Sequence, residues 1–187
     1  MLFLLIRTFL VEAFRIPTAS MERTLLVGDF LLVNKAVYGA QVPGTGAKLP
    51  AFDAPRFGDI VVFTPPHEPD KNYVKRLVGL PGDTLAMRDK VLYRNGRALS
   101  ERYVAHTDLH GDVVSPDMRW QCDYLPAGAE RERCRPTRDN WGPIVVPAGK
   151  YFMLGDNRDD SEDSRYWGFV DDAAIKGQPL FIYYSFD

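Results

Sequence analysis

Short apolar runs, separated by glycine, proline and polar residues, recur along this chain and leave little room for long helices. The clearest runs are rich in β-branched and aromatic residues and span residues 30–33, 59–63, 151–154 and 180–184. Runs of this length, bounded by turn-forming residues, are typical of buried strands. The 187 residues include 15 glycines and 14 prolines, a content that favours many short strands joined by turns. We therefore predict a mainly β fold with an antiparallel β-sheet core.

One long segment differs in character from the strands on either side of it. Residues 84–147 are largely polar, rich in turns and contain both cysteines. Within this segment Asn95-Gly96 lies between strand-like flanks, a strong signal for a type I′ hairpin. The sequence therefore predicts a β core built from residues 16–83 and 148–187, into which residues 84–147 are inserted as a smaller β-rich domain.

The first 15 residues form a separate apolar segment. Residues 1–6 are apolar, but Arg7 interrupts the run, so the uninterrupted stretch of about 20 apolar residues that crosses a bilayer is absent. Pro17 restricts the residue before it and ends a helix at about Ile16. We predict a short N-terminal apolar helix over residues 1–15, which is either a buried core segment or the truncated end of a longer membrane anchor.

Charge and cysteine content narrow the choice of partners and compartments. The 23 basic and 25 acidic residues give a formal net charge of −2, which provides no broad cationic field for nucleic acid. Cys122 and Cys134 are close in sequence, and they form a small disulfide if the compartment is oxidising or remain thiols in a cytosol. We predict no nucleic-acid partner.

Spacing alone suggests two metal sites, and both are poorly supported. Residues 156–160 alternate like a calcium loop, but an arginine takes one ligand position and Ser161 stands where such a loop needs glycine. His106 and His110 are four positions apart, yet the cysteines are too far apart for a compact zinc site. His67 lies in a proline-rich stretch and is expected to be an exposed loop residue. The sequence predicts no metal and no other cofactor.

A serine and a lysine are candidates for nucleophilic chemistry. Ser20 follows the helix-breaking Pro17, and Lys75 shares one face of a predicted strand with Tyr73 and Leu77. Lysine acts as a base only as the neutral amine, so its pKa must fall from about 10.4 to roughly 7–8. Burial among apolar neighbours can lower a lysine pKa by this amount. The two residues therefore define a candidate nucleophile and a candidate base.

Three sequence blocks carry a more specific signal than the pair alone. They are residues 16–21 (IPTASM), 73–83 (YVKRLVGLPGD) and 155–168 (GDNRDDSEDSRYWG). Together with residues 24–30 and 58–63, they resemble the signature boxes of bacterial type I signal peptidases. The resemblance implies a serine endopeptidase that forms an acyl-enzyme and removes signal peptides from exported preproteins, cleaving after small residues of the Ala-x-Ala type. It also implies membrane lipid as a partner and a location at the bacterial cytoplasmic (inner) membrane, with the catalytic domain on the extracytoplasmic side.

The resemblance assigns chemical roles to four residues. Ser20 corresponds to the acylating nucleophile, and Lys75 corresponds to its general base. Thr18 stands where the family has a serine that donates to the oxyanion, and both its hydroxyl and the Ser20 backbone N–H are suited to that task. Ser161 corresponds to the hydroxyl that orients the lysine.

Other positions correspond to supporting and substrate-binding residues. Asp163 and Arg165 match a paired acid and base in the same loop as Ser161. Positions near the pockets for small residues before the cleaved bond are matched by Ile16, Met21, Leu25, Tyr73 and Val74. The apolar N-terminal segment matches the end of the membrane helix that precedes the nucleophile in the family.

The chain departs from the family pattern close to the nucleophile. The family usually has Ser-Met-x-Pro-Thr-Leu, whereas Arg23 here replaces the proline that stiffens the turn. This replacement suggests, as one alternative, a catalytically impaired homologue that only binds signal peptides. The other alternative is a Ser/Lys protease of narrower range, such as a dedicated conjugative-transfer maturation peptidase or an SOS-repressor self-cleavage protease. These share the chemistry but lack the full signature of residues 155–168.

Overall fold

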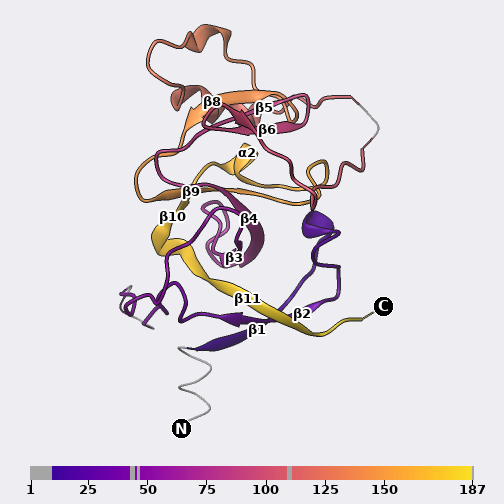
Figure 1. Cartoon of the computed structure of the whole chain (residues 1–187), viewed down its shortest axis with the longest axis vertical. Helices are drawn as coiled ribbons and strands as arrows, with labels where there is room; N and C mark the ends of the chain where they lie inside the picture. The colour runs from indigo at the N-terminus through magenta and orange to yellow at the C-terminus, as the bar shows by residue number, and fades with distance from the viewer. Residues whose placement is uncertain (1–9, 43–44, 46, 109–110, 187) are drawn as a thin grey trace.

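Two antiparallel β-sheets form the framework of the protein (Figure 1). The structure, a computed structural model, describes residues 10–42, 45, 47–108 and 111–186. Within these residues the larger sheet has seven strands in the order β1-β2-β11-β3-β4-β9-β10, and the smaller sheet has four in the order β7-β6-β5-β8. The mainly β fold with an antiparallel core, predicted from the short apolar runs, is confirmed.

Short strands predominate, as the glycine and proline content predicts. The larger sheet contains β1 (Val11–Arg15), β2 (Phe30–Asn34), β3 (Ile60–Phe63), β4 (Tyr73–Gly79), β9 (Lys150–Leu154), β10 (Val170–Asp171) and β11 (Ile175–Tyr184). The smaller sheet contains β5 (Thr84–Arg88), β6 (Val91–Arg94), β7 (Arg97–Ala98) and β8 (Trp141–Val145). The helical elements are the 3-10 helices η1 (Ala19–Met21), η2 (Pro116–Asp123), η3 (Arg131–Arg133) and η4 (Asp172–Ala174), and the α-helix α2 (Ser164–Trp167).

Strand β4, which carries Lys75, has a paired strand at each edge and an apolar cluster on each face. It pairs with β3 on one side and with β9 on the other. Tyr73 and Leu77 pack in one apolar cluster, whereas Val78 belongs to a second cluster that includes residues of the smaller sheet. Tyr73 and Leu77 therefore lie on one face of the strand, as predicted, with Lys75 between them.

The N-terminal segment does not follow the predicted helix where the structure describes it. Val11–Arg15 forms strand β1, which pairs with β2 in antiparallel register from Val11 opposite Asn34 to Arg15 opposite Phe30. Pairing with an available strand edge overrides the weak helical preference of so short a segment. The rest of the expected helix, residues 1–9, lies outside the described residues. No helix in the described part of the chain is both long enough and apolar enough to cross a membrane.

The smaller sheet packs tightly against the larger one. Its apolar side chains share a cluster with Val78 of β4 and Phe152 of β9. At position 79 an added Cβ would lie 2.5 Å from Leu85 Cδ1 and 2.9 Å from Phe152 Cβ. Gly79 therefore allows the two sheets to approach each other.

The hairpin predicted at Asn95-Gly96 is confirmed. These residues join β6 to β7 with φ values of 52° and 77°, and a positive φ at both central positions is the mark of a type I′ turn. Strands occupy both ends of the predicted insertion, and 3-10 helices occupy its middle. The boundaries of the inserted domain stay a prediction.

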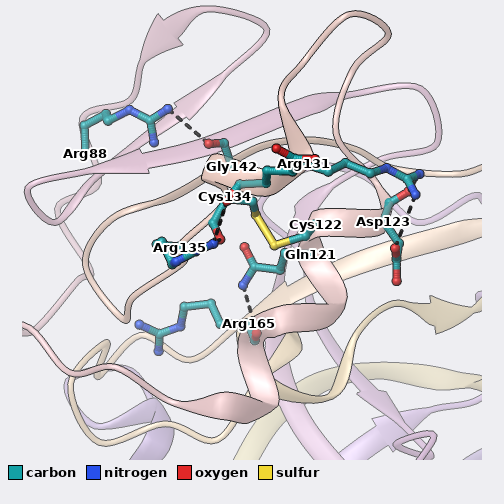
Figure 2. Close-up of a disulfide and its surroundings, with 10 residues drawn as sticks. Arg88, Gln121, Cys122, Asp123, Arg131, Cys134, Arg135, Gly142 and Arg165 are labelled. Carbon is teal, nitrogen blue, oxygen red and sulfur yellow. Dashed lines mark hydrogen bonds and ion pairs between the residues drawn. A yellow bond between two sulfur atoms is a disulfide. The ribbon is translucent and has the colours of Figure 1, made fainter.

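A disulfide fastens the segment between β7 and β8. Cys122, in η2, is bonded to Cys134 (Figure 2). The neighbouring side chains of Gln121 and Trp120 both donate hydrogen bonds to the Arg165 carbonyl in α2, at 2.9 and 3.1 Å. The inserted segment is therefore attached to the loop that contains the third sequence block.

Candidate active site

Ser20 lies in the 3-10 turn η1, which is held between the core and a loop. Ile16 and Met21, on either side of it, are 4% and 1% exposed and belong to one apolar cluster. The Ser20 carbonyl accepts a hydrogen bond of 3.1 Å from the Asn157 backbone N–H. Both anchors restrict how far the Ser20 side chain can move.

The structure brings Ser20 and Lys75 together although they are 55 positions apart in sequence. Lys75 Nζ donates a hydrogen bond of 2.6 Å to Ser20 Oγ. Lys75 is 4% exposed and Ser20 is 6% exposed, so the contact is largely shielded from water. Thr18 Oγ1 lies 3.3 Å from Ser20 Oγ, which places a second hydroxyl beside the first.

Lys75 has an altered proton affinity. Burial lowers its pKa from the ordinary 10.5 to about 8. The negative charges of Asp163 and Glu162 oppose this change, and the positive charge of Arg165 supports it. At a pKa of about 8, roughly half of the amines are unprotonated at pH 8. The site therefore offers a neutral amine in contact with a serine hydroxyl.

A cavity of about 610 Å³ opens onto this pair. Its walls come from residues 14–18, from residues 71–75 and from the loop between Gly155 and Gly168. The lining residues are Phe14, Arg15, Ile16, Pro17, Thr18, Ser20, Met21, Lys71, Asn72, Tyr73, Val74, Lys75, Asp160 and Glu162. Leu25, expected near the substrate, is not among them; it is 5% exposed and packs in the apolar cluster with Ile16 and Met21.

Asp163 and Arg165 form a fully buried ion pair beside the site. Arg165 Nε and Nη2 donate hydrogen bonds of 2.8 Å to the two carboxylate oxygens of Asp163. Burial alone would raise the pKa of Asp163, but the charge and hydrogen bonds of Arg165 outweigh it and hold this pKa below its ordinary value. Asp163 also accepts the Gly155 N–H at 3.1 Å, and Arg165 donates to the Arg158 carbonyl at 2.6 Å. The pair thus links the start of the loop, at Gly155 and Arg158, to its later part.

Ser161 is buried close to these residues, but it does not bond to the lysine. Its side-chain oxygen has no hydrogen-bond partner among the described residues. The Ser161 side chain also lowers the pKa of Asp163, but less than Arg165 does, and its geometry falls short of a hydrogen bond. An added Cβ at position 155 would lie 2.2 Å from Ser161 Oγ and 2.5 Å from the Ser20 carbonyl oxygen. Gly155 therefore allows the loop to lie against the Ser20 turn.

The sequence reasoning missed a second ion pair that joins three parts of the site. Arg76, next to Lys75 in β4, donates to both oxygens of Asp156 at 2.8 and 2.6 Å. Thr24, in the turn after Ser20, donates to the same carboxylate. Arg76 and Asp156 both lie within the matched blocks, and the arginine follows the candidate base directly. That adjacency was the signal in the sequence.

The residues considered for metals have other partners. Asp156 pairs with Arg76, and Arg158 donates to both oxygens of Glu101 at 3.0 and 2.8 Å. The cysteines are bonded to each other, and His110 lies outside the described residues. His67, expected on an exposed loop, has a side chain 30% exposed that stacks on Trp167 and lies 3.6 Å from Glu162. No cluster that could hold a metal is found in the described ranges.

The chain matches known proteins over most of its length. A solved signal peptidase I from Enterococcus faecalis aligns with 68% of this chain and 98% of its own, with 34% identity and a TM-score of 0.45. Signal peptidase I of Pseudomonas aeruginosa is 42% identical over 97% of this chain and 68% of the relative. The Pseudomonas fluorescens enzyme of the same name is 41% identical over the same shares. The family described as signal peptidase, peptidase S26, matches residues 1–184. The resemblance predicted from the three blocks is thus confirmed, and the chain belongs to the signal peptidase family, peptidase S26.

Proposed function

We propose that Ser20 is the nucleophile and Lys75 the general base of a serine endopeptidase that removes signal peptides from exported preproteins. Membership of the peptidase S26 family supports the enzyme class and the substrate. The observation that carries the residue assignment is the 2.6 Å contact between Lys75 Nζ and Ser20 Oγ at a buried site.

The proposed reaction follows from the charge state of the lysine. Neutral Lys75 accepts the Ser20 proton as Oγ attacks the carbonyl carbon of the cleaved peptide bond. The resulting ammonium returns this proton to the leaving amine, and the signal peptide remains as an acyl ester on Ser20. Water then attacks the ester with Lys75 again as base, which frees the serine. The Thr18 hydroxyl and the Ser20 backbone N–H are the proposed donors to the oxyanion.

Substrate selection is assigned to the apolar part of the cavity. Ile16, Met21, Tyr73 and Val74 line it and would leave room for small side chains before the cleaved bond, as in Ala-x-Ala. Leu25 would act indirectly, because it packs behind Met21. Supporting roles are assigned to the loop: Asp163 and Arg165 hold its shape, and Ser161 would orient the lysine after a rotation of its hydroxyl.

A membrane location is proposed from an exposed apolar face. Leu180, Phe181, Ile182, Tyr183 and Tyr184 of β11 are each 44% to 55% exposed, and Phe186 is 68% exposed. Ser185 donates to Asp29 at 2.6 Å, which brings the exposed Leu26 and Val27 next to this strand end. Contiguous apolar surface of this kind marks an interaction site. We assign it to membrane lipid and place the catalytic part outside the bacterial cytoplasmic membrane, where a disulfide persists.

We also propose a division of the chain into three parts. Residues 1–15 form the membrane-proximal segment, residues 16–83 and 148–187 form the catalytic core, and residues 84–147 form the insertion. Both candidate catalytic residues lie in the core part of this division.

The assignment is tested by single substitutions at the two residues. Ser20→Ala and Lys75→Ala should each abolish cleavage of a preprotein with an Ala-x-Ala site, because one removes the nucleophile and the other its base. Lys150→Ala, at a partly exposed lysine of β9, is the matched control and should cleave normally. The assay is single-turnover cleavage in detergent, with circular dichroism to verify folding. Retained cleavage by either variant would reject the assignment, and substrate binding without turnover by the unchanged protein would favour the impaired homologue.

A further inference from the structure

The turn after Ser20 has an unusual backbone at Arg23. Thr24 N–H and Leu25 N–H both donate to the Met21 carbonyl, at 3.0 and 2.8 Å, and Arg23 within this turn has a φ of 79°. This is the left-handed region, which is unfavourable for a residue with a Cβ. The other non-glycine residues with positive φ in the described ranges belong to the β5–β6 and β6–β7 hairpins, and they are Asp89, Lys90 and Asn95. Arg23 is thus the exception outside a hairpin.

The Arg23 side chain reaches across to the inserted segment. Its Nη1 donates a hydrogen bond of 3.1 Å to the Val104 carbonyl, 81 positions away in sequence. The next residue, Ala105, donates to the Asp156 carbonyl at 2.8 Å and accepts from the Arg158 N–H at 3.0 Å. The segment that receives the arginine is therefore itself fastened to the loop of the site.

One further hydrogen bond joins these contacts into a closed ring that includes Ser20. Asn157, between the two residues that bind Ala105, donates its N–H to the Ser20 carbonyl at 3.1 Å. The ring runs from Ser20 through Asn157 to the segment of Ala105 and Val104, and it returns through Arg23 to the Ser20 turn. Three of its hydrogen bonds join backbone groups, and the fourth is donated by the Arg23 side chain, which can be substituted.

We propose that Arg23 is a positioning residue, which holds the Ser20 turn to the inserted segment and so keeps Ser20 Oγ aligned with Lys75. This inference rests on the proposed roles of Ser20 and Lys75. The side chain is needed because the exposed turn is held in a backbone conformation that an arginine alone does not favour. When the hydrogen bond to Val104 is lost, the turn can relax, and a small displacement of a nucleophile lowers the rate of attack steeply.

Three substitutions separate the backbone of Arg23 from its side chain. Arg23→Gly permits the left-handed conformation without steric cost but does not hold it, and it removes the hydrogen bond, so the turn is free to move; we expect kcat to fall about tenfold with KM nearly unchanged. Arg23→Lys retains a donor on a long side chain and should recover most of the loss. Arg23→Pro cannot adopt a positive φ, and we expect the largest fall, about a hundredfold. Arg102→Ala, at an exposed arginine of the same inserted segment, is the control and should match the unchanged protein.

The readouts are kcat and KM for an Ala-x-Ala peptide and the midpoint of thermal unfolding, measured on the full chain beside Ser20→Ala. A lower kcat for Arg23→Gly with unchanged KM and midpoint, restored by Arg23→Lys, supports the positioning role. A kcat within twofold of the unchanged protein overturns the inference, as does a loss in kcat that only follows a loss of folded protein. Ser20→Ala distinguishes the two proposals, because its inactivity in the same assay leaves the catalytic assignment standing even when the inference about Arg23 fails.

Discussion

In the proposed mechanism, the charge state of Lys75 decides whether Ser20 can lose its proton. Burial favours the neutral amine and lowers the lysine pKa to about 8, whereas Asp163 and Glu162 favour the ammonium form. Asp163 is already paired with Arg165 at 2.8 Å in the interior. The side chain of Glu162 is 65% exposed, so it is the carboxylate that can be changed without breaking a buried ion pair.

We expect kcat/KM for an Ala-x-Ala peptide to rise with pH through about 8, because only the deprotonated amine of Lys75 accepts a proton. Glu162→Gln removes a negative charge that raises this pKa, so the rise should move to lower pH. The displacement should shrink as salt is added, since an exposed charge is screened. The measurement is the pH–rate profile, with Glu132→Gln in η3 as the control. A midpoint that stays in place, or moves to higher pH, would contradict this electrostatic account.

The candidate site residues that the structure brings into contact are the ones whose motif described a local turn or strand. Ser20 and Lys75 were found from their blocks, and the structure places them in contact. Leu25 was expected near substrate, but the sequence of a turn does not specify which side chains face the cavity and which face the core. The hydroxyl of Ser161 turns about a single bond within a loop, so its hydrogen bond could not be predicted from the motif that contains it.

At the scale of elements, prediction succeeded where a strand was buried and failed where a partner strand decided the outcome. All five strand-like runs singled out from the sequence fall in strands, namely β2, β3, β4, β9 and β11. The apolar start of the chain was expected to be helical, yet Val11–Arg15 pairs with β2, whose residues lie about 20 positions further on. Such non-local pairing leaves no periodic signal in a segment of five residues. The 3-10 helices of the insertion likewise lack a pattern of their own.

The disulfide is the element-scale feature that most affects the insertion. Replacing Cys122 and Cys134 by serine should lower the free energy of unfolding by about 2–3 kcal/mol, because the bond closes a short loop and restricts the unfolded chain. Part of the loss should come from α2, whose Arg165 carbonyl is held by the adjacent Gln121. Thermal unfolding with and without reductant provides the measurement. The double variant should match the reduced protein and be insensitive to reductant; equal midpoints for the oxidised protein and the variant would contradict the prediction.

At the scale of the whole molecule, the inserted segment and the exposed apolar face of β11 lie at opposite ends. The smaller sheet and its insertion lie at one end in Figure 1, whereas β1, β2 and the exposed part of β11 lie at the other. The apolar face proposed to contact lipid is therefore distant from the insertion.

Substitutions on this face should separate membrane binding from cleavage. Phe181→Glu with Phe186→Glu places two charges on exposed positions, and we expect vesicle binding to fall at least about tenfold, since each buried phenylalanine contributes about 1.5–3 kcal/mol. Cleavage of a soluble Ala-x-Ala peptide should be unchanged. The measurement is co-flotation with vesicles of phosphatidylethanolamine and phosphatidylglycerol. Val91→Glu, on the smaller sheet, is the control, and equal flotation of the double variant and this control would exclude the face as the lipid contact.

Strand β11 lies between β2 and β3 although it comes latest of the described strands in chain order. Strand β11 therefore joins two parts of the sheet that are synthesised before it. One is the pair β1 and β2, which flank Ser20, and the other is the part that contains Lys75. While the ribosome is still adding residues before position 175, this sheet has a gap at its centre. Because β11 pairs with both halves, we expect a nascent chain to complete this sheet, and to become able to cleave a peptide, only after β11 has emerged.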